Sequence, residues 1–206
     1  MALPLGIALL LAFLLGSVPF GLLLVRLLTG KNLRKLGSGN IGATNASRAF
    51  GKKARLPVFL GIYVLDASKG LLPTLFFLAP QASLGAKVLV GFAAILGHCF
   101  SPFLGFKGGK GVATTSGVLL GLDWLAFLVG ILAFFIVFGF TRIVALGSLA
   151  LGMGLALSLI LEDPSQAFGA RLPLTLLGLF IALFLFWTHR DNLRRLFVAK
   201  KTGENL

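Results

Sequence analysis

Apolar segments of membrane-spanning length, or close to it, recur along this chain of 206 residues and are separated by short polar stretches. Hydrophobic residues make up 57% of the chain and charged residues only 12%. A helix that crosses a membrane needs about 20 apolar residues, whereas soluble domains carry about 25% charged residues. The sequence therefore predicts an all-α integral membrane protein, a bundle of about seven transmembrane helices forming a single domain over residues 1–206. The expected spans are 3–28, 56–79, 84–104, 111–122, 124–140, 143–161 and 172–188.

The fourth expected span is short, and Asp123 interrupts the apolar run that follows it. Counting it separately gives seven spans, whereas merging it with the next segment or making it re-entrant gives fewer. Within it, Gly117 and Gly121 form a GxxxG pair, which predicts close packing against another helix. The first segment is longer than the core of a signal peptide and lacks a charged start, so a retained span is expected.

The distribution of basic residues predicts the orientation of the chain. There are 19 basic and 6 acidic residues, a formal net charge of +13. If the N-terminus is outside, the segments 29–55, 105–110, 141–142 and 189–206 lie inside and contain 15 of the 19 basic residues. That bias satisfies the positive-inside rule and indicates a cytoplasmic C-terminus. Topology and anionic lipid or substrate explain the charge, so nucleic acid is not an expected partner.

The glycine–lysine loop, Gly105–Thr115, reads GFKGGKGVATT and lies between apolar segments. Glycine lets the backbone approach an anion closely, and the small residues after the lysines can start a helix whose N-terminus favours anions. A phosphate site fits this pattern; a cationic loop that only obeys the positive-inside rule is the alternative. The candidate phosphate-binding residues are Lys107, Gly108, Gly109, Lys110 and Gly111.

A second polar loop, the GSGN loop, covers Gly37–Lys53 and concentrates glycines and short hydrogen-bonding side chains near one arginine. Such side chains suit phosphate and hydroxyl recognition, and arginine can hold phosphate through two parallel N–H groups. A solvated loop would tolerate the same residue types. The candidate substrate-binding residues are Ser38, Gly39, Asn40, Gly42, Thr44, Asn45 and Arg48.

A third polar segment, residues 188–196, reads THRDNLRRL. On a helix His189 and Asn192 would share a face, because they are three residues apart. His189 is a candidate general base or phosphate ligand, with a capping or interfacial role as the alternative. Arg142, in the short segment between the fifth and sixth spans, is a further candidate for phosphate binding.

Two charged residues inside the second span, Asp66 and Lys69, stand one helical turn apart. Bare charges are costly in a membrane, so we expect these two to pair. His98 clusters with Cys99 and Ser101 near the end of the third span, and we expect this cluster to lack a nearby carboxylate. One cysteine gives no disulfide framework, and the spacing of metal ligands is absent, so no metal site is expected.

Three segments together resemble the signature motifs of the bacterial membrane acylphosphate–glycerol-3-phosphate acyltransferase family, PlsY. They are GSGNIGATN with Arg48, GHCFSPFLGFKGGKGVATT and THRDNLRRL. The segments GSVPFG, DASKG and TRIVALGS resemble the family as well, so the resemblance runs through nearly the whole chain. Ala145 stands where many relatives have serine, and Asp191 where glutamate is common.

The resemblance implies a seven-helix enzyme of the bacterial inner (cytoplasmic) membrane whose motifs meet at the cytoplasmic face. Such enzymes transfer a fatty acyl group from acyl phosphate to glycerol 3-phosphate, giving lysophosphatidic acid, and need no cofactor. The expected partners are these two substrates and membrane lipids, and the small size permits a monomer. The competing function is transport of organic phosphate, but the polar groups gather on one side and no internal repeat is evident.

An acyl phosphate carries a good leaving group, so positioning and electrostatic stabilisation can supply most of the acceleration without a covalent nucleophile. We expect catalytic roles for Ser38, Lys107, His189 and Asn192. Ser38 would bond a substrate phosphate or the attacking hydroxyl. We expect the hydroxyl proton to pass to the substrate phosphate, with His189 and Asn192 binding the acceptor; His189 as the base is the alternative.

Overall fold

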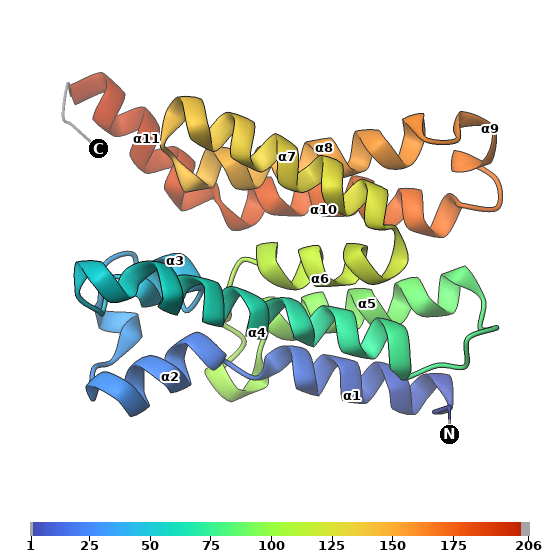
Figure 1. Ribbon diagram of the computed structural model, residues 1–206, viewed down its shortest axis with the longest axis horizontal. Helices are drawn as coiled ribbons and strands as arrows, with labels where there is room; N and C mark the ends of the chain where they lie inside the picture. Colours follow the sequence, from blue (N-terminus) through green and yellow to red (C-terminus); the bar gives the residue numbers. More distant parts are fainter. Residues whose placement is uncertain (1, 203–206) are drawn as a thin grey trace. The chain divides into compact units, whose positions relative to one another are not determined.

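The computed structural model describes the backbone of residues 2–202 and the side chains of residues 2–198. Within that part all regular structure is helical, which confirms the predicted class, and the chain divides into two compact units, Met1–Leu122 and Asp123–Leu206 (Figure 1). In the first unit the described helices are α1 (Leu5–Ser17), α2 (Phe20–Thr29), α3 (Ala43–Ser47), α4 (Arg55–Phe76), α5 (Leu84–Cys99) and α6 (Val112–Leu122), with 3-10 turns η1 (Leu33–Lys35), η2 (Lys52–Ala54) and η3 (Pro102–Leu104).

Five helical segments in the described chain are long and apolar enough to cross a membrane, and they correspond to five of the expected spans. The last expected span, Leu172–Thr188, meets the same test only together with Arg190–Val198, to which it is bent by 49°. The fourth expected span forms the 11-residue helix α6, which is shorter than a full crossing. The five segments are Leu5–Thr29, Lys52–Phe76, Leu84–Leu104, Trp124–Thr141 and Val144–Leu161.

The first span is broken rather than continuous. Helix α1 ends at Ser17 and α2 begins at Phe20, with Pro19 between them, a residue that has no backbone N–H to donate. The break exposes the carbonyl of Val18, which accepts a hydrogen bond of 2.9 Å from Lys69 Nζ. Backbone groups that lose their helical partners inside a membrane need other partners. The lysine supplies a donor to the free carbonyl, and the carbonyl supplies an acceptor to the buried ammonium.

Small residues allow the helices of the first unit to pack closely, α1 beside α5 and α4 beside α6 (Figure 1). A Cβ at Gly117 would overlap the backbone of Ala67, and one at Gly70 would overlap the carbonyl of Thr114. The close packing predicted for Gly117 is therefore confirmed. In lipid, helices associate through such contacts because the tails are as apolar as the side chains.

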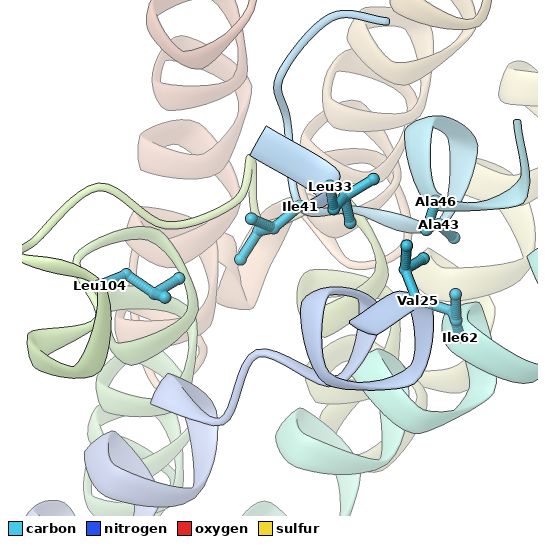
Figure 2. Packing of buried hydrophobic residues seen from close by; sticks show 7 residues of the cluster. All are labelled: Val25, Leu33, Ile41, Ala43, Ala46, Ile62 and Leu104. Carbon is cyan, nitrogen blue, oxygen red and sulfur yellow. The ribbon is translucent and has the colours of Figure 1, made fainter. Parts of the chain in front are cut away.

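An apolar cluster anchors the GSGN loop (Figure 2). Ile41 comes from the loop itself and is 4% exposed, although the loop around it is polar. Full burial of an aliphatic side chain stabilises a fold by about 1.5–3 kcal/mol, so Ile41 fixes the middle of the loop. The members of the cluster are Val25, Leu33, Ile41, Ala43, Ala46, Ile62 and Leu104.

The second unit packs two long helices against a central α8. At one end Arg171 Nη2 contacts Asp123 and lies 2.7 Å from Glu162 Oε2. Asp123 also accepts the Ala126 N–H at 2.8 Å and so caps the helix that begins at the break predicted here. The hydrogen bond to Glu162 raises the pKa of Arg171 above its ordinary value. The helices are α7 (Trp124–Thr141), α8 (Val144–Leu161), α9 (Pro164–Ala167), α10 (Leu172–Thr188) and α11 (Arg190–Thr202).

Candidate active site

Asn45 organises the GSGN loop from inside. It is 3% exposed, and its Oδ1 accepts the Ser38 N–H at 3.0 Å. Its Nδ2 donates to the carbonyls of Leu36 at 2.9 Å and Asn40 at 2.8 Å. Both ends of the side-chain amide are thus engaged within the loop. The structure gives Asn45 a scaffolding position, whereas the sequence prediction made it a substrate ligand.

Two glycines give the GSGN loop its turn. Gly37 has φ +51° and Gly39 φ +73°, left-handed conformations that glycine adopts without strain. A Cβ at Gly37 would also overlap Asn45 Oδ1. The result is a tight turn in which Ser38 is half-buried, and Thr44, in α3, is half-buried as well.

Three of the predicted phosphate-binding cations have no carboxylate partner among the side chains that the structure describes. Arg48 and Lys107 in the first unit and Arg142 in the second are exposed. None of the three forms an ion pair with a carboxylate among the side chains that the structure describes. Arg171, by contrast, binds two carboxylates. Unpaired guanidinium and ammonium groups beside tight loops are the groups that attract a phosphate.

The glycine–lysine loop lies against the C-terminal end of α5. The Gly108 N–H donates to the carbonyl of Cys99 at 3.0 Å, and the Gly109 N–H donates to that of His98 at 2.9 Å. A Cβ at Gly108 would overlap the same carbonyl of His98. These two amides therefore donate within the chain, and the close approach to α5 explains why both residues are glycine.

The amides available to a phosphate in this loop are consequently expected further along, where α6 begins. Gly111 there has φ +84°, and α6 starts at Val112. The first N–H groups of a helix have no partner within the helix, and they favour an anion. Lys110, which precedes them, is half-buried.

Arg34 ties the two loops together within the first unit. Its Nη2 donates to the carbonyl of Leu104 at 3.0 Å and to that of Lys107 at 3.2 Å. The backbone of Lys107 is thereby fixed to the segment that leads into the GSGN loop. Arg34 was not among the predicted site residues, because a cation in an expected cytoplasmic loop is explained by topology alone.

The predicted Asp66–Lys69 pair is confirmed, with Lys69 Nζ 2.8 Å from Asp66 Oδ1 in the buried interior. His98 joins it: its Nδ1 lies 3.0 Å from Lys69 Nζ and 3.9 Å from Asp66 Oδ1. The expectation that His98 lacks a nearby carboxylate is therefore wrong. Helix α4 brings Asp66 to it from a distant part of the sequence.

In the second unit His189 follows α10 and is 3% exposed. Its Nδ1 lies 2.9 Å from the carbonyl oxygen of Leu185. A carbonyl only accepts, so we assign the proton to Nδ1, and Nε2 of the neutral ring then carries the lone pair. This tautomer makes Nε2 the atom that can accept a hydrogen bond, or a proton, from a hydroxyl group.

Asn192 is half-buried and lies in the first turn of α11, three residues after His189. The Leu193 N–H donates to the His189 carbonyl at 3.0 Å, so helical bonding continues through the bend between α10 and α11. Arg142 ends α7 in the left-handed conformation, with φ +58°. Among the described side chains, no group of three His, Cys, Asp or Glu could hold a metal ion.

The sequence matches the family model described as Glycerol-3-phosphate acyltransferase over residues 6–199. The chain belongs to this family. A glycerol-3-phosphate acyltransferase of Jannaschia sp. (strain CCS1) is 47% identical over 198 residues, which cover 95% of this chain and 90% of the relative. Its counterpart from Anaeromyxobacter dehalogenans (strain 2CP-C) is 43% identical over 190 residues, 89% of each chain.

Two crystal structures of PlsY (YgiH), an integral membrane glycerol 3-phosphate acyltransferase, are similar to this chain. The glycerol 3-phosphate form has a TM-score of 0.80 and 33% identity, and covers 95% of this chain and 92% of that chain. The lysophosphatidic acid form has a TM-score of 0.78 and 31% identity at the same coverage. The resemblance drawn from the three motifs is thus confirmed, and this family member is an all-helical integral membrane acyltransferase.

Proposed function

We propose that this chain transfers a fatty acyl group from acyl phosphate to the primary hydroxyl of glycerol 3-phosphate. The products are lysophosphatidic acid and phosphate, in the first acylation of phospholipid synthesis. The observation that carries the proposal is the pair of exposed cations Arg48 and Lys107, without carboxylate partners among the described residues, on loops whose backbones are hydrogen-bonded by Asn45 and Arg34. Both substrates are phosphates, and the family is an acyltransferase family.

The chemistry needs positioning more than a nucleophile. The hydroxyl oxygen of the acceptor forms an ester bond to the acyl carbon, the bond from that carbon to the phosphate oxygen breaks, and the hydroxyl proton leaves. Lys107, Lys110 and Arg48 would hold the substrate phosphates and stabilise the oxyanion that forms between these two events. Ser38 would donate to a phosphate oxygen or to the attacking hydroxyl.

For the proton we favour the phosphate oxygen of the acyl phosphate as acceptor. His189 Nε2, assigned above as the lone-pair nitrogen, would accept a hydrogen bond from glycerol 3-phosphate, and Asn192 would bind beside it. Arg142 would contribute a further charge for phosphate. The alternative, His189 as general base, uses the same nitrogen and predicts a different kinetic signature.

We further propose that the two compact units serve as one acyltransferase domain in the bacterial inner membrane. Counting α6 and α10 as crossings supported by neighbouring helices gives seven spans, with the N-terminus outside and the C-terminus cytoplasmic. The basic segments, and with them the three motifs, then lie on the cytoplasmic side, as the positive-inside rule requires. A monomer suffices for this reaction.

The test is formation of lysophosphatidic acid by purified protein from glycerol 3-phosphate and either palmitoyl phosphate, with release of phosphate, or palmitoyl-CoA as the parallel donor, with release of CoA. We expect release from acyl phosphate alone, dependent on the acceptor and lost in Lys107→Ala. Lys87→Ala, which removes a half-buried lysine outside the motifs, is the matched control and should keep full activity. Release from neither donor, or only from palmitoyl-CoA, would contradict the proposal.

A further inference from the structure

We propose that His98 is a positioning residue of this enzyme, whose ring, fixed by the buried Asp66–Lys69 pair, sets the conformation of the glycine–lysine loop. The inference rests on the proposed function, because it gives that loop its role in phosphate binding. His98 does not need to touch the substrate. It determines where the two lysines of the loop stand.

His98 meets the loop through both its backbone and its ring. Its carbonyl accepts the Gly109 N–H at 2.9 Å, and the adjacent Cys99 carbonyl accepts the Gly108 N–H. A Cβ built at Gly109 would overlap Nε2 of the imidazole. The ring edge therefore occupies the space that the Cβ of any other residue at position 109 would need. The backbone of the loop packs directly against the imidazole ring.

The ring itself is held from the other side. The Lys69 ammonium has three N–H donors, and it has three acceptors within reach: Asp66 Oδ1 at 2.8 Å, the Val18 carbonyl at 2.9 Å and His98 Nδ1 at 3.0 Å. Because an ammonium cannot accept, Nδ1 of His98 must accept, and the proton of the neutral ring lies on Nε2. A flipped ring would lose a buried hydrogen bond, so the orientation toward Gly109 is fixed.

The same helix α4 also holds the other end of the loop. The hydroxyl of Thr114, at the start of α6, donates to the Asp66 carbonyl at 3.0 Å. The carbonyl of Asp66 thus binds Thr114, after the lysines of the loop. The carboxylate of Asp66 acts on Gly108 and Gly109 indirectly, through Lys69 and His98. Two lysines that must meet phosphates at fixed distances gain from such rigid support, because misplacement by about 1 Å can reduce the rate 100-fold.

The variants that test the role are His98→Asn and Gly109→Ala. Asparagine places an acceptor where Nδ1 stands and so keeps a bond to Lys69, but it removes the ring edge at Gly109. Ser101→Ala is the matched control: Ser101 is buried at the same end of α5, yet its hydroxyl donates to the Ser17 carbonyl and not to the loop. All are compared by KM, kcat and thermal unfolding in detergent.

We expect His98→Asn and Gly109→Ala each to raise KM for the substrates at least about tenfold, because the loop lysines are displaced from the substrate phosphates, with a smaller change in kcat. Ser101→Ala should leave KM unchanged. The double variant should be no worse than His98→Asn, because removing the ring relieves the overlap with the new methyl group. Additive losses in the double variant, or an unchanged KM in His98→Asn, would overturn the proposal.

Amide hydrogen exchange of peptides covering residues 105–111 tests the same claim without activity. Exchange should be faster in His98→Asn than in the parent and unchanged in Ser101→Ala. Equal exchange in His98→Asn and the parent would overturn the positioning role. If the parent protein fails to use acyl phosphate, the proposed donor is wrong, and the exchange result still decides the role of His98.

Discussion

The two histidines of the chain stand in similar places, one at the end of α5 in the first unit and one just after α10 in the second, and both are buried. Their hydrogen bonds are opposite. Nδ1 of His98 accepts from the Lys69 ammonium, whereas Nδ1 of His189 lies 2.9 Å from the Leu185 carbonyl, to which we assign its proton. In the neutral rings the proton is therefore on Nε2 in His98 and on Nδ1 in His189.

In each ring, the partner of one nitrogen therefore decides what the other nitrogen can do. His189 presents a lone pair, which suits contact with a hydroxyl group of a substrate. His98 presents an N–H at Gly109, in a place that a glycine backbone fills. We therefore expect the two histidines to have different roles, His189 in contact with a substrate and His98 in support of a loop.

We expect the greatest loss when the ion pair that holds His98 in place, Asp66–Lys69, is broken. Asp66→Asn leaves the Lys69 ammonium, 1% exposed, without its counter-charge. We expect a loss of about 3–5 kcal/mol of stability, the usual cost of an uncompensated buried charge. Thermal unfolding in detergent measures it, and Asp66→Asn combined with Lys69→Met should recover most of the loss. Equal stability of Asp66→Asn and the parent would show that the pair does not hold the first unit.

The next effect tests the other histidine. His189→Gln removes the lone-pair nitrogen from its fixed position, and we expect kcat/KM for glycerol 3-phosphate to fall about 100-fold, mostly through KM. Initial rates at varied acceptor concentration separate the two constants. If kcat falls while the affinity for glycerol 3-phosphate is unchanged, His189 acts as the general base and substrate-assisted proton transfer is wrong.

A smaller effect is expected at Arg34, which supports the glycine–lysine loop as His98 does but from the solvent side. Arg34→Lys keeps the charge but cannot reproduce the bonds to the carbonyls of Leu104 and Lys107. We expect KM for acyl phosphate to rise about tenfold. Lys35→Gln removes a neighbouring exposed charge as the control. An unchanged KM in Arg34→Lys together with a raised KM in Lys35→Gln would mean that charge, and not loop geometry, matters here.

The smallest effect is expected at the acidic end of the second unit. Arg171→Gln breaks the contacts with Asp123 and Glu162, which are partly solvent-exposed, so we expect a stability loss of about 1 kcal/mol or less. Both Michaelis constants should stay unchanged, in contrast to His189→Gln in the same unit. A raised KM would connect this end of the unit to the reaction.

Much of the fold could be predicted from the sequence because membrane spans are defined by length and apolarity, which are local properties. Five expected spans and the Asp123 break are confirmed. The division of the first span at Pro19 was missed, since a proline does not interrupt the hydrophobicity by which a span is recognised. The short α6 was predicted as ambiguous, and it forms an apolar helix too short for a full crossing.

The candidate site, like the fold, was predictable only where local sequence determines it. The motif loops were recognisable as segments, but the roles of Asn45, Arg34 and His98 depend on partners that the sequence does not place beside them. Arg34 and Lys107 are 73 positions apart, and Lys69 and His98 are 29 apart. His98 was seen in the sequence without its carboxylate, and only the packing of α4 against α5 supplies Asp66.

The most direct test of the contrast between the two histidines is nitrogen NMR of protein labelled with [¹⁵N]histidine, purified through a tag without histidine. The sequence contains only two histidines, and His98→Asn and His189→Gln assign their signals. At alkaline pH we predict one ring protonated on Nε2, from His98, and one protonated on Nδ1, from His189. Two rings with the same tautomer would contradict the account.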